Sequence, residues 1–82
     1  MICKWIKSGK GLFSTTAIGQ NGELFHLVVE RVPGQNRNRA WDWATWCAKR
    51  AETTARHGYT SSAKAGMATA EGITAAELIG PR

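Results

Sequence analysis

The hydrophobic and polar positions alternate on either side of Asn21-Gly22. Residues 15–18 and 23–29 are rich in β-branched, aromatic and aliphatic side chains, and Asn-Gly supplies the two positive-φ positions of a type I′ turn. The pattern therefore predicts a β-hairpin in which Gln20 lies opposite Glu23 and Ile18 lies opposite Phe25. Both predicted faces have apolar content: one carries Thr16, Ile18, Phe25, Leu27 and Val29, and the other carries Phe13, Leu24, His26 and Val28.

A third strand is predicted after residues 33–38, which form a turn-prone segment with Pro and Gly followed by polar residues. Residues 39–50 follow with tryptophans in strand-like order. Strand alternation places Trp41 and Trp43 on one face and Trp46 on the opposite face. The loop is too long to fix the register, so the pattern leaves open which of these faces meets the core.

The last part of the chain has helical periodicity. Thr60, Ser61 or Ser62 can cap the helix N-terminus. Gly72 is expected to end or weaken this helix, and residues 74–77 fit a capping box that starts a short second helix through Ile79. The predicted apolar stripe consists mostly of small residues, which allow a helix to lie close to a sheet: Ala63, Gly66, Met67, Ala70 and Ile73.

These elements predict a single α+β domain over residues 1–82. Its antiparallel meander has three strands, or four if residues 2–7 also pair, packed by one C-terminal α-helix and a short terminal helix. The strands are expected within residues 2–50 and the helices within residues 60–79. Phe25 and Leu27 are predicted to be core residues that pack on Ala63, Met67 and Ala70.

Composition narrows the class of protein. A chain of 82 residues can build one thin core, and its formal net charge of +5 favours an acidic partner, either nucleic acid or an acidic protein surface. We find neither a signal-peptide core nor an apolar run long enough for a membrane span, so we expect a cytoplasmic protein without a membrane partner. Cys3 and Cys47 are then expected to be reduced thiols. The oligomeric state is left open.

The residue types that carry chemistry are scattered. Zinc sites draw their ligands in closely spaced pairs, and Cys3, His26, Cys47 and His57 have no such spacing. Nothing local marks either thiol as an activated nucleophile. Residues 8–15 lack the spacing and the following helix of a phosphate-binding loop, and the acidic residues have no acid–base signature. We therefore expect no metal, no cofactor and no catalytic residues.

The basic residues gather around the predicted loop at 33–38 and just beyond it, interleaved with tryptophan. Arg and Trp together suit nucleic acid, through phosphate pairing and base stacking, and are equally enriched in protein–protein hot spots. We expect the surface to centre on the turn, where Arg39 and Trp41 share one strand face. Lys49, Arg50 and Arg56 are expected to form a weaker rim. The candidate partner-binding residues are Arg31, Arg37, Arg39, Trp41, Trp43, Lys49, Arg50 and Arg56.

Over residues 12–72 the order of elements resembles two groups of proteins. One is the three-stranded DNA-binding domains of phage integrase arms and plant ethylene-response factors, which lay a sheet in the major groove. Arg39, Trp41 and Trp43 match the Arg and Trp interleaved along their strands, whereas residues 15–17 do not. The other is the small prophage-encoded α+β proteins, matched by residues 41–43, Gly58, Ser61 or Ser62, and 63–71.

Several proteins of the second group are anti-CRISPR inhibitors. That resemblance implies a non-enzymatic, phage-encoded binding protein that occludes a surface of a host nucleic-acid-guided defence complex. The partner would then be an acidic or nucleic-acid-binding protein complex in the host cytoplasm. The alternative is a module that binds DNA or RNA directly through a basic, Trp-bearing antiparallel sheet.

Overall fold

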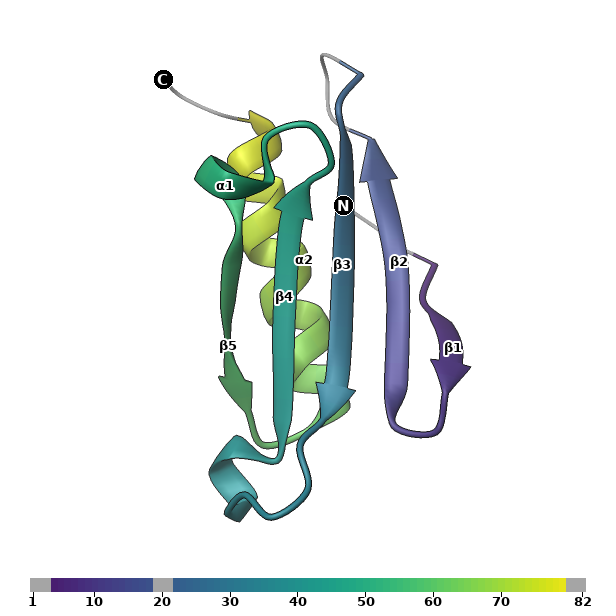
Figure 1. Ribbon diagram of the computed structural model, residues 1–82, viewed down its shortest axis with the longest axis vertical. Coiled ribbons are helices and arrows are strands. Elements are labelled where there is room, and N and C mark those ends of the chain that lie inside the picture. Colours follow the sequence, from purple (N-terminus) through teal and green to yellow (C-terminus); the bar gives the residue numbers. More distant parts are fainter. Residues whose placement is uncertain (1–3, 19–21, 80–82) are drawn as a thin grey trace.

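The computed structural model describes residues 4–18 and 22–79, and it is an antiparallel sheet packed on one side by a helix (Figure 1). The five strands lie in chain order across the sheet. They are β1 (Ile6–Gly9), β2 (Leu12–Ile18), β3 (Leu24–Arg31), β4 (Trp41–Cys47) and β5 (Arg56–Thr60). The α+β meander is confirmed, but the predicted three or four strands are too few. The additional strand is β5, which lies beyond residue 50, whereas the sequence pattern placed all strands before that residue.

Two short helical turns connect these strands, and one long helix follows them. The turns are η1 (Arg37–Arg39), a 3-10 helix before β4, and α1 (Ala51–Thr54), which lies between β4 and β5. The long helix is α2 (Ala63–Ile79). Ser62 caps it, since its Oγ accepts a hydrogen bond of 3.1 Å from the Ala65 amide.

The helix α2 runs without interruption through Gly72, so the predicted break at this residue is wrong. A glycine costs a helix only about 1 kcal/mol, and packing of the helix on the sheet outweighs that cost. Thr74 does not start a second helix either. Its side chain is fully buried inside α2, and its hydroxyl lies 2.5 Å from that of Thr45 on β4.

The predicted register of the β2–β3 hairpin is wrong by one residue. Ala17 pairs with Phe25 and Ile18 with Leu24, whereas the predicted hairpin placed Ile18 opposite Phe25. Because side chains alternate along a strand, this shift turns β2 over. Phe13, Thr15 and Ala17 therefore lie on the side of the sheet that faces α2, together with the buried residues of β3, and Ile18 lies on the other side. Asn21 of the predicted turn lies outside the described residues.

The core forms between the sheet and α2, which packs on β3, β4 and β5 (Figure 1). Phe25, Leu27 and Ala70 are buried, and Ala63 and Met67 pack against them, as predicted. The helix approaches the sheet closely at Gly66. A Cβ atom added there would lie 3.2 Å from Cγ1 of Val29, and the small-residue stripe is the reason that this approach is available.

The helix side of the sheet is covered only in part. The indole of Trp5 donates a hydrogen bond of 2.6 Å to the Glu71 carboxylate and so ties the segment before β1 to α2. Beyond this contact, α2 lies over β3, β4 and β5 and leaves β1 and most of β2 uncovered, although Ala17 at the end of β2 is buried in the core (Figure 1). Among the described residues, no helix is both long and apolar enough to cross a membrane.

Candidate functional site

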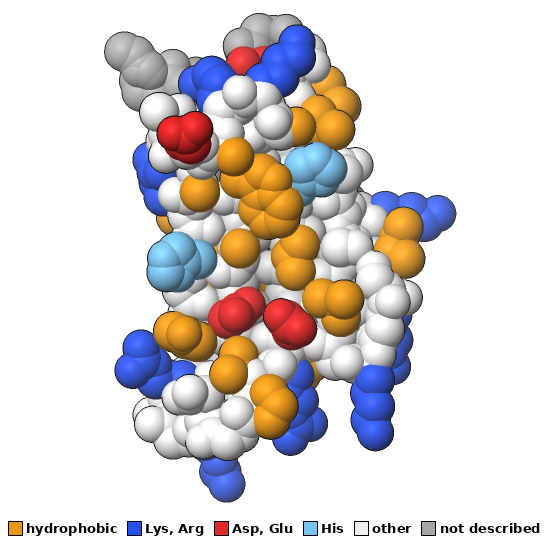
Figure 2. Space-filling view, in the orientation of Figure 1, with side chains coloured by type: hydrophobic (Ala, Val, Ile, Leu, Met, Phe, Trp, Pro, Cys, Tyr) orange, Lys and Arg blue, Asp and Glu red, His pale blue; other side chains and the backbone are white. Residues whose placement is uncertain are grey.

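In the described part of the chain, α2 packs on one side of the sheet, and we call the other side, which no long element covers, the open face (Figure 2). Strand pairing assigns its residues. One row of cross-strand partners, from β1 to β5, consists of Ile6, Ser14, Val28, Ala44 and His57. The next row consists of Thr16, His26 and Trp46 on β2, β3 and β4. A row at one end contains Leu12, Glu30, Asp42 and Tyr59, and Ile18 pairs with Leu24 at the other end.

The open face is more apolar than the solvent side of an antiparallel sheet normally is. Ile6 and Ile18 are 62% and 63% exposed, and Tyr59 is 45% exposed. Leu24, Val28 and Trp46 are half-buried by their neighbours on the same face. Figure 2 shows hydrophobic side chains along the length of this face, including its middle. A contiguous exposed apolar surface of this kind usually marks a site of interaction with another molecule.

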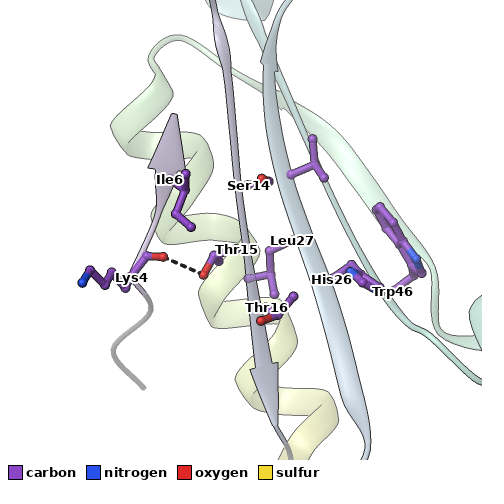
Figure 3. Close-up of a pocket in the computed structure, with 9 residues that line it drawn as sticks. Lys4, Ile6, Ser14, Thr15, Thr16, His26, Leu27 and Trp46 are labelled. Carbon is purple, nitrogen blue, oxygen red and sulfur yellow. Dashed lines mark hydrogen bonds between the residues drawn. The ribbon is translucent and has the colours of Figure 1, made fainter. Parts of the chain in front are cut away.

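A shallow groove of about 450 Å³ crosses the open face (Figure 3). Short side chains of β2, Ser14 and Thr16, lie between Ile6 on one side and the paired rings of His26 and Trp46 on the other. The two ring centroids are 5.5 Å apart, with the ring planes tilted by 30°. The difference in side-chain height between β2 and its neighbours creates the groove.

Two carboxylates lie side by side on the open face, because Glu30 on β3 pairs with Asp42 on β4. Like charges directly opposite one another on neighbouring strands are destabilising. In the described part of the chain, neither carboxylate has an ion-pair partner. They bring negative charge to the middle strands of a protein whose net charge is positive.

A second candidate surface lies where the β1–β2 turn and the β3–β4 loop meet, at one end of the sheet (Figure 1). We call this the basic end, and its cations are Lys7, Lys10, Arg31, Arg37 and Arg39. It contains a hollow of about 660 Å³, which we call the basic hollow. Its lining combines cations, aromatic rings and turn residues: Lys7, Lys10, Gly11, Phe13, Arg31, Pro33, Gly34 and Trp41.

The predicted partner-binding residues are only partly brought together. Arg31 and Trp41 are direct cross-strand neighbours and both line the basic hollow. The expectation that Arg39 shares a strand face with Trp41 is wrong, because residues 37–39 form a 3-10 turn in which strand alternation does not apply. The Arg39 guanidinium lies instead over the ring of Tyr59, 4.7 Å from the centroid, at the edge of the open face. Arg37 is exposed in the same turn.

The remaining predicted residues lie elsewhere. Trp41 and Trp43 share a face opposite to Trp46, as predicted, but that face meets α2 and Trp43 is only 8% exposed. Lys49, Arg50 and Arg56 lie at the opposite end of β4 from the basic end, a strand length of roughly 20 Å away. The Arg50 guanidinium pairs with Glu23 at 2.6 Å, and this hydrogen-bonded contact raises the pKa of Arg50.

The soft metal ligands and candidate nucleophiles are separated by the sheet. Cys47 is a free thiol buried in the core, whereas His26 and His57 lie on the open face. Cys3 lies outside the described residues. No group of three or more His, Cys, Asp or Glu side chains in the described ranges is arranged to hold a metal ion.

The sequence pattern missed the residues that complete both surfaces. Lys7, Lys10 and Phe13 join Arg31 and Trp41 only because the first and second hairpins place these residues at the same end of the sheet. For Val28, the signal was the apolar content on both faces of the predicted hairpin. For Trp46, the signal was the strand alternation that placed it on the face opposite to Trp41 and Trp43.

We compared the chain with family models, with curated proteins and with solved structures, and found no significant match in any of the three.

Proposed function

We propose that this is a non-enzymatic binding protein that docks its open face on a partner protein and thereby occludes the partner's surface. The observation that carries the proposal is the apolar, grooved open face, which has no covering element among the described residues. Exposed apolar surface is unfavourable in water, and burying it against a partner would contribute free energy to a complex. Trp46 supplies the aromatic anchor that protein interfaces favour.

Charge favours a protein over nucleic acid as the occupant of this face. A sheet that lies in a DNA groove must present cations to the phosphates. The middle strands of the open face instead present Glu30 and Asp42. The tryptophans of the expected DNA-reading strand, Trp41 and Trp43, are on the opposite side of the sheet. The open face therefore fits a protein surface with apolar residues and a basic group better than it fits a phosphate backbone.

The class of partner follows from the resemblance to anti-CRISPR proteins. We propose a host nucleic-acid-guided defence complex, whose surfaces that bind nucleic acid carry the basic side chains that the Glu30–Asp42 pair would attract. Phage origin and action in the host cytoplasm belong to this same proposal. No catalytic step is required, because a bound protein of this size blocks access simply by its volume.

The test is phage plating on a bacterial host with an active RNA-guided defence system, with a targeting or a non-targeting guide. Wild-type protein is expected to restore plating only in the targeting strain. Ile6→Lys/Ile18→Lys places charges on two exposed apolar positions of the open face and is expected to abolish the effect. The matched control, Ser61→Lys/Ala68→Lys, adds the same charge at exposed positions off this face and should act as wild type.

Binding of the purified defence complex, measured by calorimetry, separates the two parts of the proposal. Failure of the wild-type protein to bind or to restore plating contradicts the class of partner. Binding that survives Ile6→Lys/Ile18→Lys contradicts the open face as the docking surface. An interface centred on buried aromatic and aliphatic side chains is expected to weaken only modestly when salt is added.

A further inference from the structure

The basic hollow has the composition of a ligand site rather than of a solvated surface. Phe13 and Trp41 are half-buried, and their ring centroids are 6.1 Å apart with planes tilted by 42°. Lys7, Lys10 and Arg31 contribute the charged part of the lining. The hollow of about 660 Å³ has a size typical of small-ligand sites.

Two backbone contacts build this hollow from separate hairpins. The Arg31 amide donates a hydrogen bond of 2.8 Å to the Gly11 carbonyl, and the Val32 amide donates one of the same length to the Ala40 carbonyl. Gly11 has a φ of +70°, and a Cβ there would lie 3.1 Å from Cβ of Arg31. Glycine at this position therefore lets the β1–β2 turn lie against Arg31, so that Lys10 and Arg31 line the same hollow.

Negative charge is kept away from the hollow by strand alternation. Glu30 and Asp42 are next to Arg31 and Trp41 in sequence, but they point to the open face. No acidic residue of the described chain lines the hollow. Its cations therefore present positive charge beside aromatic rings without a neutralising carboxylate.

We propose that the basic hollow binds a nucleotide unit of single-stranded nucleic acid. Lys7, Lys10 and Arg31 pair with successive phosphates, and the base lies against Phe13 and Trp41. Cationic grooves with aromatic side chains are the usual means of holding single strands without sequence preference. The site is on the other side of the sheet from the open face, so this proposal does not rest on the one above.

A single strand fits this site better than a duplex does. The rings that would stack on a base are half-buried in the lining of the hollow. Bases in a duplex are stacked on one another and do not reach such rings, whereas an unpaired base does. The phosphates on either side of that base then pass the lysines and the arginine.

Fluorescence anisotropy with three labelled probes tests this site. The probes are a single-stranded oligonucleotide of mixed sequence, an abasic oligomer of the same length, and the matching duplex. The single strand is expected to bind about tenfold more tightly than the abasic oligomer, because base stacking adds to phosphate pairing. It is expected to bind more tightly than the duplex.

Lys10→Glu/Arg31→Glu changes two exposed side chains of the hollow and is expected to weaken single-strand binding at least about tenfold. The slope of log affinity against log salt should become shallower by about 0.7 for each phosphate that the variant no longer neutralises. The matched control, Lys49→Glu/Lys64→Glu, makes the same change in net charge at exposed positions outside the hollow and should bind within about threefold of wild type. Thermal melts confirm that both variants are folded.

Three results would overturn the proposal. Equal losses in the two variants would mean that net charge alone attracts the probe. Equal affinity for the single strand and for the abasic oligomer or the duplex would show that no unpaired base binds in the hollow. Absence of binding by the wild type would show that the hollow is not a nucleic-acid site. None of these results would bear on the open face, which is tested with Ile6 and Ile18.

Discussion

Gly58 on β5 lies directly beneath the indole of Trp43 on β4. A Cβ atom added to residue 58 would lie 3.0 Å from both Cζ2 and Nε1 of that ring. The two residues are cross-strand partners on the helix side of the sheet. The absence of a side chain at residue 58 is what allows the tryptophan ring to pack against β5 and remain buried.

Gly58→Ala is therefore expected to reduce the free energy of unfolding by about 1–3 kcal/mol, because the buried ring must shift to admit a methyl group. Urea unfolding followed by tryptophan fluorescence measures the loss. Gly9→Ala is the control, since nothing lies within 4 Å of its added Cβ, and its effect should stay within about 0.5 kcal/mol. Equal effects of the two substitutions would contradict the stacked arrangement.

The two glycines inside α2 are expected to respond in opposite ways. Gly72 is exposed with open space at its Cβ position, so Gly72→Ala should stabilise the protein by about 0.5–1 kcal/mol through helix propensity. At Gly66 the same gain is opposed by contacts of 3.1 Å with Oγ1 of Thr60 and 3.2 Å with Cγ1 of Val29. Thermal melts should give Gly66→Ala a free energy of unfolding at least about 1 kcal/mol lower than that of Gly72→Ala. The reverse order would contradict the close approach of the helix to the sheet at Gly66.

The buried hydrogen bond between Thr45 and Thr74 predicts a strong coupling between these residues. Both side chains are at most 1% exposed, and their hydroxyl oxygens are 2.5 Å apart. Thr45→Val should cost about 1–3 kcal/mol because it leaves the Thr74 hydroxyl buried without this partner, whereas Thr45→Val/Thr74→Val should recover most of that loss. A double-mutant cycle in urea measures the coupling. Additive losses would show that the hydroxyls do not depend on each other.

Leu27 is completely buried at the centre of the sheet. Leu27→Ala is expected to cost about 2–4 kcal/mol by leaving a cavity beneath α2. The half-buried Leu24, on the open face, provides the comparison, and Leu24→Ala should cost clearly less. A loss below about 0.5 kcal/mol for Leu27→Ala would contradict its place in the core.

The Glu30–Asp42 pair predicts a gain in stability when one charge is removed. Glu30→Gln should raise the free energy of unfolding by about 0.2–1 kcal/mol, since it ends a like-charge contact between neighbouring strands. Added salt should stabilise the wild type more than the variant, because it screens the repulsion. Glu52→Gln on α1 controls for the change in net charge. A loss of stability in Glu30→Gln would indicate that the carboxylate is needed by the fold.

The elements with strong periodicity were predictable from the sequence, whereas the way they join was not. The stripe from Ala63 to Ile73 and the alternation of Trp41 and Trp43 both appear in the structure as expected. The β2–β3 register depends on how many residues the turn contains, and a shift of one residue in the pairing was enough to turn β2 over. The strand β5 gave no hydrophobic signal, because its stability comes from pairing with β4 rather than from apolar side chains of its own.

The candidate surfaces were less accessible to sequence reasoning than the fold was. The basic residues near the β3–β4 loop were visible as a cluster, but the cluster separates in space because β4 carries its two flanking groups to opposite ends. Lys7 and Lys10 became part of a hollow with Arg31 only once the first hairpin was placed beside the second. A contact between residues so far apart in the chain has no signature in local spacing.

The meander order also affects the order in which the chain can fold. Every strand pairs with its neighbour in sequence, so the sheet can assemble hairpin by hairpin from local contacts, whereas α2 needs a formed sheet to pack on. While the helix is undocked, Phe25, Leu27 and Val29 face water on one side of the sheet, and the open face adds apolar side chains on the other. We therefore expect a partly folded chain with an undocked helix to be the state most prone to aggregate.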